Sequence, residues 1–175
     1  MKSLLDYVKV YKNVIPHELC DGVIAKYKDN KNFKLSPTEG GYNPDIRSCT
    51  QVELTGDEEF DTKVFHEQKK NIKRYVAEFP QAVINKDTGY ALLKYEVGTY
   101  FKEHVDHSPR NPRTISCSII LNDDFEGGDF AFFDKEHIIK ANKGDVIMFP
   151  SNFLYRHQVL PITKGIRYSI ITWFK

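Results

Sequence analysis

The tripeptide His104-Val105-Asp106 places an imidazole and a carboxylate two residues apart. Its neighbours predict a strand over residues 100–106. In a β-strand, residues i and i+2 project from the same face, so both groups would point toward one site. Such a pair can supply two ligands to a metal ion. A surface hydrogen bond between the two side chains is the alternative explanation.

A metal ion bound by this pair needs a third ligand, and the candidates are His107, His137 and His157. His157 lies in a second strand-like segment, residues 154–159. Two histidines and one carboxylate on a β scaffold, with the other coordination positions open, form the facial triad of non-haem Fe(II) oxygenases. The spacing alone does not distinguish the three candidates.

Arg167 follows His157 by ten residues, on the next predicted strand, and shares one strand face with Ser169, Ile171 and Trp173. An arginine in a mostly apolar sheet is costly to bury unless it meets an anion. A guanidinium can bind a carboxylate through two hydrogen bonds, which suits the distal carboxylate of a dicarboxylic acid. A surface arginine on an edge strand is the alternative.

The elements that must position these residues change in character near Gly89. Before it, apolar spacing and end signals predict two helices and a strand: a helix over 16–27, a strand over 46–54, and a helix from a capping box of Thr55 and Glu58 to Pro80. After it, turn residues separate eight predicted strands: 90–95, 100–106, 114–121, 129–133, 137–139, 145–149, 155–160 and 167–174.

Eight short strands at this spacing favour a sandwich or a double-sheet jelly roll. We therefore expect a single domain over residues 1–175 of the α+β class, mainly β. Residues 1–88 would form a helical support region with an added strand, and residues 89–175 would form the jelly-roll core. The helices are expected to cover the outer face of one sheet.

The 25 Lys and Arg residues nearly balance the 24 Asp and Glu residues, which gives a formal net charge of +1. This balance argues against a nucleic-acid or membrane partner held by bulk electrostatics. Cys20, Cys49 and Cys117 are far apart and are expected to be reduced thiols rather than zinc ligands. No apolar segment has the pattern of a signal peptide or a membrane span, so a cytoplasmic location is expected.

Four segments resemble the prolyl-4-hydroxylase-like family of Fe(II)/2-oxoglutarate-dependent dioxygenases: 95–106 (YEVGTYFKEHVD), 120–130 (ILNDDFEGGDF), 143–150 (KGDVIMFP) and 157–174. All four occur in the family's order and near its spacing, within the half of the chain that begins at Gly89. Arg47 and Ser48 also resemble the N-terminal support strand of the family.

This resemblance implies a double-stranded β-helix core and ligation of Fe(II) by His104, Asp106 and His157. It also implies that Arg167 binds the distal carboxylate of 2-oxoglutarate, with help from the hydroxyl of Tyr95.

Three further residues are implied to bind the cosubstrate, namely Ser116, Ser118 and Trp173. The two serines share a strand face with Ile120, where some relatives have tyrosine. Other relatives have lysine in place of Arg167, and the change to arginine keeps the charge.

The implied activity is decarboxylation of 2-oxoglutarate to succinate and CO2, coupled through Fe(II) and O2 to hydroxylation of a substrate. A prolyl residue in a peptide or protein is the expected substrate, and ascorbate is a further candidate cofactor. The alternatives are hydroxylation of a free amino acid or other small molecule, and a non-catalytic jelly-roll metal-binding module. The loop over residues 30–45 has the composition of a lid. Arg110 and Arg113 lie in a loop close to His104, where contact with an acidic or polar substrate is the alternative to the expected solvation.

Overall fold

The computed structural model describes residues 2–175 and contains two α-helices and thirteen short strands. The helices are α1 (His17–Tyr27) and α2 (Asp61–Glu78), and a 3-10 helix η1 (Leu4–Tyr7) precedes them. The strands are β1 (Lys9–Tyr11), β2 (Lys34–Leu35), β3 (Thr50–Glu53), β4 (Ala91–Tyr95), β5 (Phe101–His104), β6 (Ile115–Ile120), β7 (Glu126–Gly127), β8 (Phe130–Phe132), β9 (His137–Ile139), β10 (Val146–Pro150), β11 (His157–Val159), β12 (Ile162–Lys164) and β13 (Arg167–Phe174).

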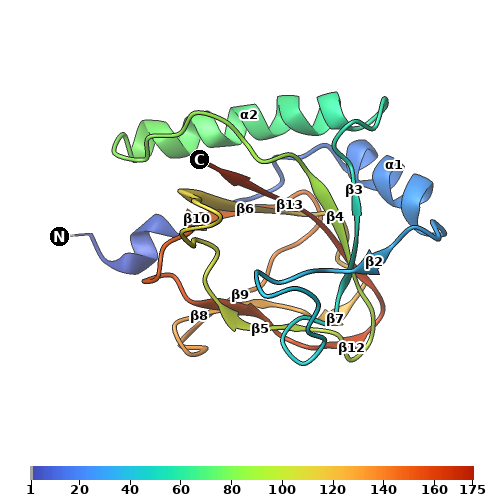
Figure 1. Ribbon diagram of the computed structural model, residues 1–175. Helices are drawn as coiled ribbons and strands as arrows, with labels where there is room; N and C mark the ends of the chain where they lie inside the picture. Colours follow the sequence, from blue (N-terminus) through green and yellow to red (C-terminus); the bar gives the residue numbers. More distant parts are fainter. Residues whose placement is uncertain (1) are drawn as a thin grey trace.

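Two facing antiparallel sheets form the centre of the molecule (Figure 1). The larger sheet has the strand order β1-β10-β6-β13-β4-β3-β2, and the smaller sheet has the order β5-β11-β8-β9. Strands β7 and β12 form a separate pair. This arrangement confirms the predicted jelly roll with a mainly β composition.

Side-chain alternation on the strands of the larger sheet creates two different buried faces. On β6, Ile115, Cys117 and Ile119 pack in the cluster that contacts the helices, whereas Ser116 and Ser118 face the smaller sheet. All six residues of β6 are buried, as expected for a strand covered on both sides. One face therefore supplies the main apolar core, and the other face is free to carry polar groups.

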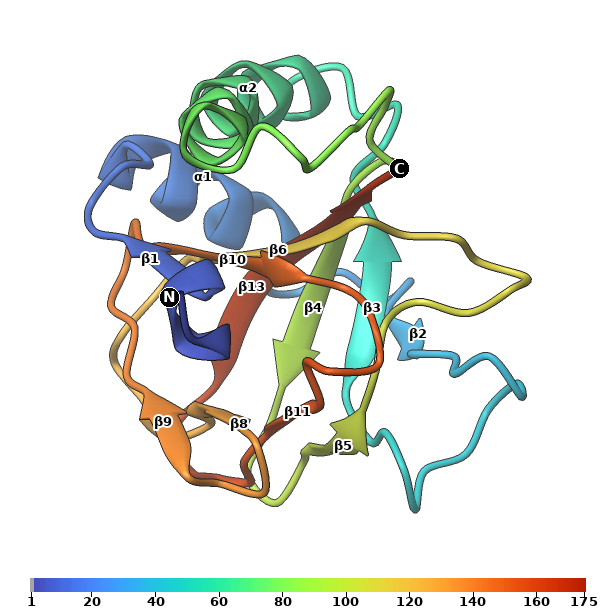
Figure 2. The same ribbon diagram turned by 90° about the vertical axis from the view of Figure 1, so that its left-hand side faces the viewer.

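Both helices cover the outer face of the larger sheet, as predicted (Figure 2). Helix α1 contributes Cys20, Val23 and Tyr27 to the core, at the predicted three- and four-residue spacing. Helix α2 is followed by Phe79 and then Pro80, which confirms the predicted end of this helix.

The predicted capping box at the start of the second helix is wrong. Helix α2 begins only at residue 61, and the Thr55 hydroxyl instead accepts a hydrogen bond from the backbone N–H of Tyr90 at 2.7 Å. Asp57 organises the turn before the helix, because its Oδ1 accepts the N–H of Glu59 and of Phe60, both at 2.9 Å. The hydrogen bond to Tyr90 thus occupies the Thr55 hydroxyl that a capping box would have used.

The strand predicted over residues 46–54 is shorter, because β3 begins at Thr50 and Arg47 forms only an isolated bridge with Phe101. Strands β1, β2, β7 and β12 were not predicted; each has only two or three residues, too few to show an alternation. The three cysteines are buried free thiols, as expected. Within residues 2–175, no helix combines the length and the apolar character needed to cross a membrane.

Candidate functional site

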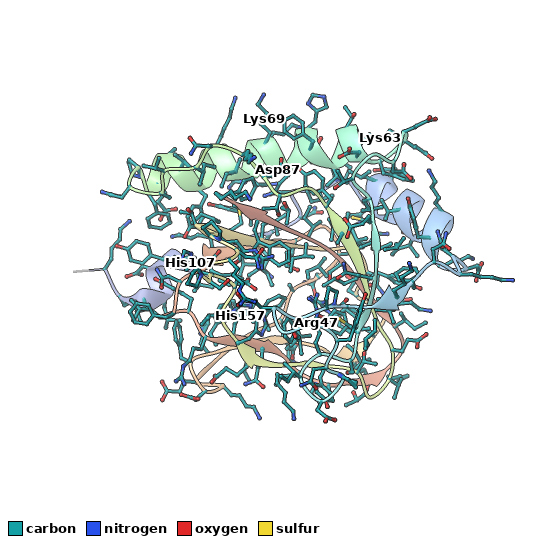
Figure 3. The ribbon with its side chains drawn as sticks, viewed as in Figure 1. Arg47, Lys63, Lys69, Asp87, His107 and His157 are labelled. Carbon is teal, nitrogen blue, oxygen red and sulfur yellow. The ribbon has the colours of Figure 1, made fainter. Side chains whose placement is uncertain are left out.

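Two neighbouring strands of the smaller sheet bring the predicted metal ligands together. His104 ends β5, His157 begins β11, and the two residues are direct cross-strand partners. The Nε2 atoms of His104 and His157 each lie 3.5 Å from one carboxylate oxygen of Asp106. Possible ligand atoms of all three residues lie within 4.8 Å of one another, and residues 2–175 contain no second such cluster of His, Cys, Asp and Glu. Figure 3 shows His157 between the two sheets.

Backbone carbonyls hold both imidazoles in the orientation that a metal ion requires. The Nδ1 of His104 lies 2.8 Å from the carbonyl oxygen of Lys102, and the Nδ1 of His157 lies 3.0 Å from that of Tyr155. A carbonyl can only accept, so each Nδ1 carries the proton. The lone pair of each Nε2 therefore points toward Asp106 and is available for a metal.

The charges of the three residues also suit a divalent ion. Burial raises the pKa of Asp106, but the neighbouring histidines and a 2.6 Å hydrogen bond from the Ser116 hydroxyl outweigh it, so the pKa lies below its ordinary value. Burial and the neighbouring His104 lower the pKa of His157 to about 4, which keeps this imidazole neutral near pH 7. One carboxylate and two imidazoles are a donor set that fits Fe(II).

A narrow inner pocket leads from the triad, between the two sheets, to Arg167. Its walls are mainly apolar and consist of Leu93, Tyr95, Phe101, Phe130, Phe149, Val159 and Ile171. Its polar residues are the metal triad, Arg47, Arg167, Ser116, Ser118 and Ser169. Arg167 is only 2% exposed; its Nη1 donates to Ser169 at 2.9 Å, and its Nη2 is buried with no hydrogen-bond partner among residues 2–175. Such an uncompensated cation fits a ligand that brings a carboxylate.

The other residues predicted to bind the cosubstrate occupy three different places. Tyr95 is the cross-strand partner of Arg167, and its ring centroid lies 5.2 Å from the guanidinium carbon. Ser118 also lines the inner pocket. Ser116 is bonded to the triad carboxylate and, at 2.8 Å, to the hydroxyl of Ser151. Trp173 lines the outer cleft described next, at the other end of the strand that carries Arg167.

An outer cleft of about 640 Å³ opens on the other side of the triad. Two loops form much of its walls, through residues 37–40 of the first and residues 108 and 111–113 of the second, together with His104, Asp106 and Trp173. The first loop belongs to the segment predicted as a lid. Its Glu39 accepts a 2.7 Å hydrogen bond from the hydroxyl of Ser108 in the second loop. The closing movement of a lid stays a prediction.

Sequence reasoning missed two arginines near the triad. Arg47, noted only as part of a support strand, is 5% exposed and lines both the inner pocket and the outer cleft. Arg113 was expected to be solvated, but its guanidinium carbon lies 3.5 Å above the ring centroid of Trp173. The signal for Arg113 was its position seven residues after a metal ligand, in a loop stiffened by Pro112.

Gly128 provides room for the side chain of Arg167. Its backbone has φ +66°, and a Cβ atom at this position would lie 3.0 Å from Cδ of Arg167 and 2.3 Å from Cδ1 of Ile162. A side chain would therefore push against the residue that ends the inner pocket.

Comparison with known proteins gives a family match for the second half of the chain. Residues 90–175 match the model of the 2OG-Fe(II) oxygenase superfamily. A PKHD-type hydroxylase of Xylella fastidiosa (strain M12) is 42% identical over 73 residues, which are 39% of this chain and 31% of the relative. The aligned region thus spans about a third of the length of that curated relative.

Solved structures resemble the chain over nearly its whole length. A prolyl-4-hydroxylase of Pseudomonas putida superposes with a TM-score of 0.81 at 17% identity, over 97% of this chain and 92% of the other. A prolyl hydroxylase of Trichoplax adhaerens, solved with a peptide fragment of hypoxia inducible factor, gives 0.80 at 15% identity, over 96% and 83%. At these identities the likeness shows a shared fold.

Proposed function

Because residues 90–175 belong to the 2OG-Fe(II) oxygenase superfamily, we propose that the protein is an Fe(II)- and 2-oxoglutarate-dependent dioxygenase that hydroxylates a prolyl residue in a peptide or protein. One observation carries the proposal beyond the family match. The metal triad and the unpartnered Nη2 of Arg167 lie at the two ends of one inner pocket. A dicarboxylate that chelates a metal at one end needs both features.

In this proposal, His104, Asp106 and His157 hold the iron. When bound, the iron and 2-oxoglutarate supply an oxidation that consumes O2, yields succinate and CO2, and converts a substrate C–H group to C–OH. The protein's own part is to fix the ligands: the carbonyls of Lys102 and Tyr155 set the tautomers of both histidines, and the Ser116 hydroxyl fixes the carboxylate.

Arg167 binds the distal carboxylate of 2-oxoglutarate in this proposal. Its Nη2 is the free donor, while Nη1 stays bonded to Ser169, which holds the guanidinium plane in place. Tyr95 and Ser118 line the same pocket and would contribute hydroxyl groups. The aromatic walls exclude water, which strengthens the ion pair between arginine and carboxylate.

The outer cleft is the proposed place for the substrate. It is bordered by His104 and Asp106 and is open to solvent, so a segment of a peptide could reach the metal without entering the inner pocket. Two structural neighbours whose names describe them as prolyl hydroxylases support a prolyl substrate, and one of them was solved with a peptide.

An anaerobic titration of the apo protein with Fe(II) and 2-oxoglutarate tests the cofactor part of the proposal. We expect a visible metal-to-ligand charge-transfer band that His157→Ala abolishes and that His66→Ala, an exposed residue on α2, leaves unchanged. Iron binding without this band would instead support a jelly-roll metal-binding module that does not use 2-oxoglutarate.

Peptide screening tests the substrate part. Proline-containing peptides should release succinate above the level without peptide and should gain the mass of one oxygen atom. Free proline and other amino acids are the comparison, because turnover confined to them would support the small-molecule alternative.

A further inference from the structure

Arg47 is a buried cation that forms no salt bridge within residues 2–175, and the carboxylate whose charge acts on it is Asp106, a metal-triad residue. Its Nε donates to the sulfur of Cys49 at 3.4 Å, and its Nη1 donates to the carbonyl oxygen of Pro37 at 3.1 Å. Its Nη2 is buried and has no hydrogen-bond partner anywhere in the described chain, residues 2–175. A thiol and a carbonyl are neutral, so Arg47 is held in position while its charge stays unpaired. Burying such a group is costly unless an anion binds to it.

The position of Arg47 separates it from the proposed carboxylate site at Arg167. Its guanidinium carbon lies 4.6 Å from the ring centroid of Phe101, and this ring stacks on the imidazole of His104 with centroids 3.5 Å apart. The ring of Phe101 therefore lies between Arg47 and the metal ligand His104. The hydrogen bond from Arg47 to the carbonyl of Pro37 holds the guanidinium at the wall of the outer cleft. Figure 3 shows Arg47 and His157 between the two sheets.

Arg113 presents a second guanidinium to the same cleft. Its plane is supported by Trp173, and its Nη1 donates to the backbone carbonyl of Asp106 at 3.3 Å. The nearest carboxylate oxygen, also of Asp106, is 4.0 Å away and belongs to the metal triad. Glu39 of the nearby lid segment accepts a hydrogen bond from Ser108, and its charge acts on Arg113 without forming a salt bridge to it. Two arginines thus border the outer cleft without a carboxylate of their own.

We propose that Arg47 and Arg113 recognise a carboxylate of the substrate, next to the ring that is hydroxylated. This inference rests on the proposed function and narrows its substrate class to prolyl compounds with a carboxylate close to the ring. The carboxylate is either the main-chain terminus of a C-terminal prolyl residue or the side chain of an acidic neighbour in the peptide. Arginine suits either source, because its planar guanidinium binds a carboxylate through two hydrogen bonds.

Ligand-observed NMR on the Mn(II)-loaded protein, with and without 2-oxoglutarate, tests the inference without turnover. Mn(II) broadens the signals of ligands that bind close to it. The probes are two matched pairs: N-acetylproline and its amide, and N-acetyl-Pro-Glu-amide and N-acetyl-Pro-Gln-amide. In at least one pair, we expect the carboxylate to bind about tenfold or more tightly than its neutral partner. The pair that shows the preference identifies the source of the carboxylate.

Three variants assign the preference to residues. Arg113→Gln should remove most of the preference for the carboxylate probe. Arg47→Lys should reduce this preference while keeping a positive charge at the buried position. Arg110→Gln is the matched control, because it removes the same charge from an exposed position in the same loop that does not line the cleft. Melting temperatures of all variants show whether each remains folded.

Equal binding within both pairs, or no binding of any probe, would overturn the inference. It would also be overturned if Arg110→Gln lost the preference as Arg113→Gln does, or if Arg47→Lys weakened 2-oxoglutarate binding and left the preference intact. Failure of the proposed function has a separate signature: the Fe(II) charge-transfer band is absent before any prolyl probe is added.

Discussion

The inner pocket and the outer cleft share two of the three metal ligands, His104 and Asp106, but they are built from different kinds of segment. Strands of the two sheets form most of the inner pocket, and their apolar side chains surround the buried guanidinium of Arg167. Loops form much of the outer cleft, which is wider and contains charged residues of both signs. The pocket is therefore suited to one fixed small ligand, and the cleft to a ligand that can differ from one relative to the next.

The two regions also differ in what holds them in shape. Tyr95 and Arg167 are fixed by a continuous antiparallel ladder between β4 and β13. The lid segment is held by few contacts, among them the hydrogen bond between Ser108 and Glu39 and a tight turn between Thr38 and Gly41. Local opening costs less free energy where backbone hydrogen bonds are few. We therefore expect the cosubstrate end of the site to be rigid and the substrate end to adjust.

The largest effect should come from the metal site, at which the two regions meet. His157→Ala removes one of the three metal ligands, so turnover should fall by more than the roughly 10- to 100-fold that loss of an outer partner usually costs. Metal binding, measured by isothermal titration, and succinate release should decline together. Retained turnover in His157→Ala would contradict the claim that the two regions adjoin one metal site.

A change at the closed end should affect the inner pocket alone. Arg167→Gln leaves the distal carboxylate of 2-oxoglutarate without its cation, so the KM for 2-oxoglutarate should rise by about 10- to 100-fold. Metal affinity should stay the same, because Arg167 does not contact the triad, and Arg167→Lys should recover part of the loss. A KM that does not change, measured by succinate release, would place the cosubstrate elsewhere.

Substitutions of Ser116 and Ser118 distinguish a residue that supports the metal ligands from one that lines the cosubstrate pocket. Ser116→Ala removes the 2.6 Å hydrogen bond to Asp106, so Fe(II) affinity should fall by about tenfold or more while saturating iron restores turnover. Ser118→Ala is the matched control on the same strand face, and it should leave Fe(II) affinity unchanged. Equal effects of the two variants on the iron titration would contradict this division.

The smallest effect should come from Asp57, which lies outside both regions. Burial raises the pKa of its carboxyl group, but hydrogen bonds from Lys26, Tyr27 and the turn N–H groups lower the pKa by more than burial raises it. The pKa therefore lies below the ordinary 3.8. The charged form therefore stabilises the fold above about pH 4, and this contribution disappears as the pH falls through the lowered pKa. Asp57→Asn should cost about 1 kcal/mol at pH 7 and less at pH 3.

Urea unfolding at the two pH values measures this effect. The Fe(II) and 2-oxoglutarate titrations of Asp57→Asn should match those of the unchanged protein. A variant that is equally destabilised at both pH values would show that the carboxylate charge is not the cause.

The parts of the molecule that could be predicted from sequence are those with a regular pattern. The strand that contains Arg167 and Ser169 is rich in β-branched and aromatic residues and follows a turn signal, so it could be predicted. The His104–Asp106 spacing identified two residues that do lie at one site, although β5 ends at His104 and the predicted strand over 100–106 is shorter. Arg47 and Arg113 were missed because their surroundings come from distant segments. The environment of Arg47 depends on a lid segment and on Phe101, more than fifty residues away in the chain.

The capping box failed for the same reason. Thr55 has the right type and spacing for a helix start, but its hydroxyl is used by Tyr90 on a strand 35 residues later. A local motif predicts well only where no distant partner competes for the same atoms.

Because Nη2 of Arg167 has no hydrogen-bond partner among residues 2–175, binding of 2-oxoglutarate should raise the melting temperature of the protein. A ligand that binds only the folded chain adds about 2.7 kcal/mol to the free energy of unfolding at a concentration of one hundred times its Kd. The ligand also brings a carboxylate to a buried cation that forms no salt bridge within residues 2–175 and that otherwise feels the charge of Asp129. A melting curve recorded against increasing 2-oxoglutarate therefore reports how full this pocket is, and it does so for every variant above before any substrate has been identified.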